Sequence, residues 1–142
     1  ILSPPGECET HGVLITSTYG TSDQHVIFRI DAEGVSVAHL GLTNKPLSEE
    51  QIEVLGEVDV LLLPIGHEQA FDAEEAVKIV NAIEPRLIIP IAYKSDNDPT
   101  AGSPQAFLKE FGNGATATEK KIIIKKKDLP VDETRVIVLE KE

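Results

Sequence analysis

Apolar residues in this chain fall into short runs between polar turns, and the first third of the chain has the pattern of β-strands. Apolar and β-branched residues gather at 13–15, 25–30 and 35–40, with Gly and Asp turn signals between the runs. The four residues from Asp31 to Gly34 are typical of a hairpin turn, because glycine reaches positive φ angles without steric cost. The sequence therefore predicts three strands, of which the last two form a hairpin.

The pattern then changes to a helix followed by a buried strand. Residues 46–55 predict a short helix with Ser48 as its N-cap, Gln51 as the second half of a capping box and Gly56 as its end. Residues 58–63 are apolar apart from one Asp, which is typical of a strand covered on both faces. We expect this strand to lie at the centre of a sheet.

A second helix is predicted from Asp72 to Ile83, because its apolar residues share one helical face. These residues are Ala73, Ala76, Val77, Val80 and Ile83. A buried strand at 87–91 follows. The two strands that flank this helix imply a right-handed βαβ crossover between parallel strands.

The last third of the chain predicts a helix at 104–111, with Phe107, Leu108 and Phe111 turned inward, and a final strand at 134–139. Between them, residues 120–127 hold three isoleucines among five lysines. We interpret this segment as a strand at a sheet edge, which lysine protects from edge-to-edge pairing; the alternative is a surface for an anionic partner. No repeat or linker divides the chain, so residues 1–142 are expected to form a single domain.

The composition fits one globular domain and excludes several classes of partner. The chain has 142 residues, 41% of them hydrophobic and 26% charged, which allows a sizeable core. Its net charge of -11 repels phosphate backbones, so no nucleic-acid partner is expected. No apolar run approaches the roughly 20 residues that span a bilayer, so we expect no membrane contact and a cytoplasmic location. The chain has no Met, even at position 1, so we expect a missing N-terminal segment.

The histidines are the first candidates for chemistry, because His is the usual metal ligand and general base near neutral pH. His11, His25, His39 and His67 are scattered, and isolated histidines are mostly surface or core-edge residues. His39 and His67 are the strongest candidates, since each follows or closes a buried strand. Asp72 and the two Glu residues after it favour the positive end of a helix dipole and need no further role.

Other catalytic motifs have little support. Gly41 and Gly66 lie outside any full phosphate-binding fingerprint and are interpreted as tight turns. The single cysteine, Cys8, lies between two acids, a poor setting for a nucleophile, and it cannot form an intramolecular disulfide. No serine lies in a G-x-S-x-G elbow.

Several segments resemble, in order and spacing, the metallo-β-lactamase superfamily, specifically its UlaG-like metal-dependent hydrolases. They are Pro5-Gly6-Glu7-Cys8-Glu9, His39-Leu40-Gly41, the run from Gly56 to Gly66, Asp72-Ala73-Glu74-Glu75-Ala76 and the run from Glu84 to Tyr93. The resemblance covers nearly the whole chain but only the later part of the family's domain. It implies an αββα sandwich with a dinuclear zinc or manganese site at the edge where the two sheets meet.

The resemblance also shows where this chain departs from the family's metal ligands. The H-x-H-x-D-H motif that supplies the first ligands does not occur in the sequence. The bridging carboxylate that follows His-Leu-Gly is replaced by Leu42, and a late His is replaced by Ala92. A middle His after the first strand is missing too, unless His25 takes that place. Neither a leucine nor an alanine side chain can coordinate a cation.

We therefore expect a degenerate member of the superfamily that acts as a non-catalytic binding or assembly module without a cofactor. The alternative is a metal-dependent hydrolase in which His39, His67 or Asp72 holds zinc or manganese together with ligands from a missing N-terminal segment. A third interpretation is an independent domain that only looks like half of the family. The expected partner is a second copy or the missing segment, because half a sandwich leaves one apolar sheet face uncovered.

Overall fold

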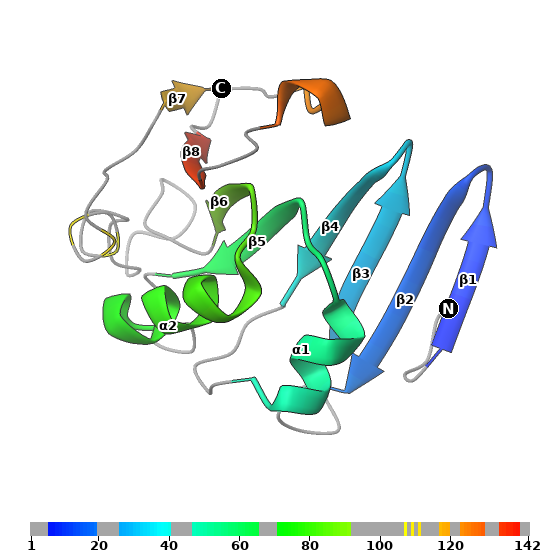
Figure 1. Ribbon diagram of the computed structural model, residues 1–142, viewed down its shortest axis with the longest axis horizontal. Coiled ribbons are helices and arrows are strands. Elements are labelled where there is room, and N and C mark those ends of the chain that lie inside the picture. The colour runs from blue at the N-terminus through cyan, green and yellow to red at the C-terminus, as the bar shows by residue number, and fades with distance from the viewer. Residues whose placement is uncertain are drawn as a thin grey trace.

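The computed structural model describes residues 6–19, 26–40, 47–65, 71–91, 107, 109, 111, 117–119, 123–129 and 134–139. The described strands pair in the order β1-β2-β3-β4-β5-β6-β8-β7 (Figure 1). The strands β1 (Gly6–Thr10), β2 (Val13–Tyr19), β3 (Val26–Ala32) and β4 (Val35–His39) are antiparallel neighbours. From β4 onward the pairing is parallel and includes β5 (Val60–Pro64), β6 (Leu87–Ile91), β8 (Arg135–Leu139) and β7 (Ala117–Glu119).

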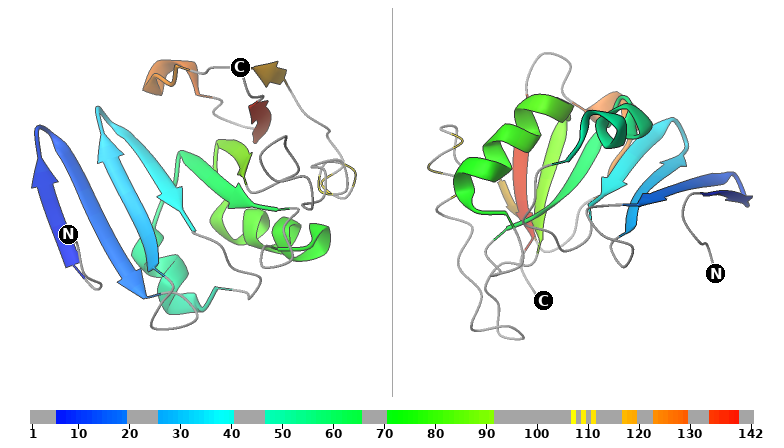
Figure 2. Two further views of the ribbon diagram at one scale, coloured as in Figure 1. Left: turned by 180° about the vertical axis from the view of Figure 1, so that it is seen from behind. Right: turned by 90° about the horizontal axis from the view of Figure 1, so that it is seen from below.

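Two α-helices, α1 (Glu49–Leu55) and α2 (Ala73–Ile83), lie on the same side of the sheet (Figure 2). A short 3-10 helix, η1 (Lys126–Asp128), precedes the last strand in the chain. The Ser48 hydroxyl accepts a hydrogen bond from the Gln51 N–H, and the Gln51 side chain accepts one from the Ser48 N–H, so the predicted capping box of α1 is confirmed.

Each face of the sheet has its own apolar cluster. The cluster under the helices contains Leu61, Leu63 and Ile88 from the sheet and buries Leu55 of α1 and Ile79 of α2. The cluster on the other face contains Val35, Val60, Leu87, Ile89 and Leu129. Parallel pairing places Val37 beside Val60, and Val60 beside Leu87, which extends this second face across three strands.

The second face is called the open face here, because both described α-helices lie on the opposite side. Val37 and Leu62 on this face are half-buried and pack against the second cluster, whereas Leu61 and Leu63 on the helix side are fully buried. A sheet with helices on one side corresponds to one half of the predicted αββα sandwich.

Most predicted elements are confirmed, including the helix-flanked pair of parallel strands. The predicted hairpin turn is shorter than expected, because Asp31 and Ala32 still belong to β3 and the loop consists of Glu33 and Gly34, both at positive φ. Strand β1 was not predicted; four of its five residues are exposed, so it has no apolar pattern to detect.

The predicted edge strand within 120–127 is wrong where the structure describes it. Residues 123–125 have no strand pairing, and η1 begins at Lys126. Ile124 is half-buried against the open-face cluster, whereas Ile123 is exposed. The predicted helix at 104–111 agrees with the helical backbone of Phe107, Lys109 and Phe111. The rings of Phe107 and Phe111 stack with their centroids 5.7 Å apart. No helix in the described residues is long and apolar enough to cross a membrane.

Candidate functional site

The parallel pairing brings the carboxyl ends of β4, β5 and β6 to one edge of the sheet. His39 pairs in register with Leu62, and Pro64 pairs with Ile91. Loops that follow parallel strands meet at such an edge, which is where ligands bind in open α/β sheets. This carboxyl edge is therefore the candidate site that the sequence predicts.

His39 is the sequence-predicted site residue that the structure places on the sheet itself. It is the last residue of β4, it is half-buried, and its cross-strand partners are Phe28 and Leu62. Because Leu62 packs with the open-face cluster, His39 lies on the open face. His67, Leu42 and Ala92, as well as His25, lie outside the described residues.

Asp72 lies at the same edge but acts as a helix cap. An isolated bridge between Ile65 and Phe71 brings the chain back to the end of β5, and Asp72 follows directly. The Asp72 Oδ1 atom accepts a hydrogen bond of 2.8 Å from the Glu75 N–H, which satisfies a free donor in the first turn of α2. Among the described residues, no group of three or more His, Cys, Asp and Glu side chains could hold a metal ion.

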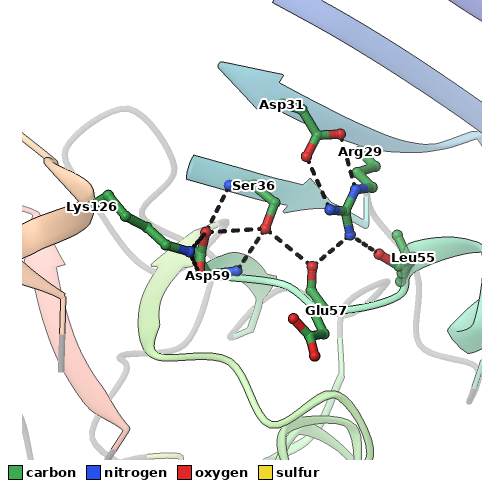
Figure 3. Close-up of polar contacts among 7 residues, drawn as sticks. All are labelled: Arg29, Asp31, Ser36, Leu55, Glu57, Asp59 and Lys126. Carbon is green, nitrogen blue, oxygen red and sulfur yellow. Dashed lines mark hydrogen bonds and ion pairs between the residues drawn. The ribbon is translucent and has the colours of Figure 1, made fainter. Parts of the chain in front are cut away.

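The opposite edge of the sheet carries a polar cluster that the sequence did not predict (Figure 3). Asp59 immediately precedes β5 and is only 7% exposed. The Lys126 ammonium lies 2.9 Å from each of its carboxylate oxygens, and Arg86 Nε lies 3.6 Å from Oδ1. The Ser36 N–H donates a hydrogen bond of 3.0 Å to Asp59 Oδ2.

These contacts set the charge state of Asp59. Burial alone raises the pKa of its carboxyl, but hydrogen bonds and charge from Lys126 and hydrogen bonds from Ser36 outweigh burial and hold the pKa below its ordinary value. The carboxylate is thus ionised, and both of its oxygens accept hydrogen bonds. Its backbone oxygen also accepts hydrogen bonds from the N–H groups of Arg86 and Leu87, so Asp59 fixes the start of β6 as well.

Arg29 forms the second part of this cluster. Its guanidinium pairs with Asp31 at 2.9 Å and donates hydrogen bonds to the backbone oxygens of Leu55 and Glu57. Arg29 therefore links β3 to the end of α1. A cavity of about 400 Å³ lies between the two parts, lined by Arg29, Asp31, Ser36, Glu57, Asp59 and Lys126 among others. Two sets of its charged side chains are paired, Arg29 with Asp31 and Lys126 with Asp59, which is the arrangement of a structural network.

The sequence could not have revealed this cluster. Asp59 stood out as one acid in an apolar run, but its partners Ser36 and Lys126 lie 23 and 67 residues away along the chain. No local spacing pattern connects them, and only the pairing of β4 with β5 and the path of residues 123–129 bring them together.

Residues 1–92 match the family model described as a β-lactamase superfamily domain. A metal-dependent hydrolase from Thermococcus onnurineus is 34% identical over 87 residues, which are 61% of this chain and 38% of that protein. A metal-dependent hydrolase from Methanosarcina mazei is 30% identical over 117 residues, covering 73% of this chain and 50% of that protein. The chain thus spans half or less of the length of these relatives.

Solved structures agree with these matches. A protein from Thermotoga maritima, described as a Zn-dependent hydrolase of the metallo-β-lactamase superfamily, superposes with a TM-score of 0.83 at 28% identity. The match covers 96% of this chain and 69% of that one. A metallo-β-lactamase fold protein from Bacillus subtilis has a TM-score of 0.65 at 11% identity and supports the fold alone. The predicted fold class is confirmed, and the chain covers part of the domain.

Proposed function

We propose that this chain, which belongs to the β-lactamase superfamily because residues 1–92 match the model of that domain, is a non-catalytic binding or assembly module built on the same scaffold. The relatives that this chain matches are named metal-dependent hydrolases. The observation that carries the proposal is the identity of two residues, Leu42 and Ala92. Both follow strands that end at the carboxyl edge.

The two positions matter because of where their strands lie. Strands β4 and β6 flank β5, and all three run in parallel, so the loops after β4 and β6 leave the same edge of the sheet. The family resemblance assigns a metal-bridging carboxylate and a His to these loops. Leucine and alanine side chains have no lone pair, and a catalytic zinc site needs about three protein donors. Losing two donors removes most of the affinity for the ion.

The remaining candidate ligands offer little compensation. The carboxylate of Asp72 already accepts the hydrogen bond that caps α2, so a metal would compete with the cap. His39 lies half-buried on the open face beside Phe28 and Leu62, both of them apolar. The described residues therefore do not fit a dinuclear site, and no hydrolytic step is derived through a metal.

The alternative function is a metal-dependent hydrolase, which the names of the relatives favour. In that case His39, His67 or Asp72 would hold zinc or manganese together with ligands from outside this chain. The ion would supply an activated water by lowering the pKa of that water. The chain's own contribution would then be metal binding at the carboxyl edge.

Elemental analysis of the purified protein separates the two functions. We expect well below stoichiometric zinc, manganese and iron after purification without chelator or metal resin, and a melting temperature that a chelator leaves unchanged. The Thermotoga maritima relative, prepared in parallel, serves as the control for metal retention. Near-stoichiometric metal, with a melting temperature that falls on chelation because the ion binds only the folded state, would overturn the proposal.

Two substitutions sharpen this test. His39→Ala and His67→Ala should leave the metal content at its background level if neither residue is a ligand. A drop in bound metal in either variant would assign that residue to a site and favour the hydrolase. Each variant is compared with His11→Ala, because His11 lies in the exposed turn between β1 and β2, away from the carboxyl edge.

A further inference from the structure

Two large apolar side chains stand exposed in the described part of the chain. Val54 is 46% exposed and Ile123 is 70% exposed. A single exposed apolar side chain is ordinary on a protein surface. These two differ from that norm because exposed charges lie near each of them in the sequence, acids at 50 and 53 near Val54 and lysines at 125 and 127 near Ile123.

The acidic patch consists of Glu50, Glu53 and Val54 of α1. Helix α1 turns Leu55 inward, where it is 1% exposed, and leaves Val54 on its outer side. Glu50 lies one helical turn before Val54, so the two side chains share a face. Both acids are exposed, and within the described residues neither of them makes an ion pair.

The basic patch consists of Ile123, Lys125 and Lys127. All three are exposed, and in the described part of the structure neither lysine makes an ion pair. The backbone of residues 123–127 is nevertheless anchored by two side chains. Lys126 binds Asp59, and Ile124 packs against the open-face cluster. An anchored backbone presents the patch with little further loss of conformational entropy on binding.

We propose that the acidic patch of one copy docks against the basic patch of a second copy of this chain. Each patch offers one exposed apolar side chain and two exposed charges of one sign, so the two are complementary in charge and in polarity. The protein carries both halves of the contact, which is why a second copy is the partner. This inference names a partner for the assembly role proposed above and rests on that role.

The ion pairs and apolar side chains available to this contact make it weak and sensitive to salt. Each exposed ion pair contributes little to the free energy of binding, so a few pairs and two apolar side chains support a transient association. The net charge of -11 on each copy opposes approach at long range. At physiological ionic strength the Debye length is about 8 Å, so this repulsion is largely screened while charges in direct contact still attract.

Sedimentation velocity over a protein concentration series tests the contact. The average mass of the wild-type protein should rise with concentration. Lys125→Glu with Lys127→Glu, and separately Glu50→Lys with Glu53→Lys, should each weaken self-association at least about tenfold, because like charges then face each other. An equimolar mixture of the two double variants should restore association between unlike copies.

Three controls keep the result interpretable. Glu7→Lys with Glu9→Lys makes the same change in net charge as the α1 variant, but on β1, and should leave association unchanged. Ile123→Ser removes the apolar contact without changing charge and should weaken association. Circular dichroism shows that each variant is folded. A wild-type protein that stays monomeric throughout, or a mixture that shows no rescue, would overturn the contact.

The two proposals fail in different ways. Stoichiometric metal together with intact self-association would refute the non-catalytic role and leave the contact standing as a measured property. A metal-free protein that never self-associates would refute the contact, and the binding role would then need another partner.

Discussion

The ammonium of Lys126 lies 2.9 Å from each carboxylate oxygen of Asp59 and joins segments that are 67 residues apart in the chain. The Asp59 side chain is 10% exposed and that of Lys126 is 48% exposed, so the pair lies at the boundary between the protein interior and solvent. Through this pair, residues 123–129 are tied to the start of β5. The same tie holds the basic patch in place.

Asp59→Asn should destabilise the protein by about 2 kcal/mol at neutral pH, because hydrogen bonds to the charged carboxylate are lost. The folded protein lowers the pKa of Asp59, so its stabilising effect is complete above the ordinary Asp value of about 4 and is lost as pH falls through the lower folded-state value. The difference between wild type and variant should therefore shrink in acid. Urea unfolding at neutral and acidic pH measures it.

Glu74→Gln is the matched control for that experiment. Glu74 pairs with Lys78 at 3.2 Å on the surface of α2, where both side chains are well exposed. Exposed pairs of this kind contribute little. A loss for Glu74→Gln as large as that for Asp59→Asn would show that generic charge, rather than the Asp59 cluster, sets the pH dependence.

Leu61 and Leu62 are neighbours on β5 that point to opposite faces of the sheet. Leu61→Ala should destabilise by about 2–5 kcal/mol, because its side chain is fully buried under the helices. Leu62→Ala should cost about 1 kcal/mol, because Leu62 is only half-buried on the open face. Urea unfolding of both variants gives the comparison. Equal losses would mean that another element covers the open face in solution.

The sequence predicted the central part of the fold because local signals and packing agree there. The capping box of Ser48 and Gln51, the apolar face of α2 and the apolar runs of β5 and β6 each point to the element that forms. The predictions failed where the local sequence pattern and the packing of the folded chain do not agree. Strand β1 is exposed and polar. Ile123 lies in the middle of an apolar run that predicts a strand, but its side chain is exposed to solvent.

The candidate site shows the same division. His39 was identified from its place at the end of a strand, and the structure puts it at the carboxyl edge. The Asp59 cluster depends on contacts with Ser36 and Lys126 that no spacing rule encodes. Long-range ion pairs follow from the topology of the sheet, and a single sequence does not state that topology.

Asp72→Ala should destabilise the protein by about 1 kcal/mol, because the Glu75 N–H loses its acceptor at the start of α2. Asp72→Asn keeps a side-chain oxygen at the cap and should lose only a few tenths of a kcal/mol. Thermal unfolding of the two variants distinguishes a cap from a metal ligand. If Asn were as harmful as Ala, and both variants lost bound metal, Asp72 would be a ligand.

Gly56 ends α1 with φ 60° and ψ -146°, a backbone conformation that residues with a Cβ atom rarely adopt. Gly56→Ala should therefore destabilise the protein by about 1–3 kcal/mol. The added Cβ would lie 3.4 Å from Nη1 of Arg29, an ordinary contact, so the loss comes from the backbone rather than from a clash.

The equivalent position after α2 gives a control of opposite sign. Glu84 caps that helix in the left-handed region at φ 52° and ψ 53°, where glycine is the preferred residue. Glu84→Gly should leave stability unchanged or raise it by up to about 1 kcal/mol, since the strain of a left-handed non-glycine residue is relieved. Urea unfolding of both variants tests the pair. If Gly56→Ala were neutral, the chain after α1 would be free to take another path, and the hydrogen bonds from Arg29 to Leu55 and Glu57 would not fix it.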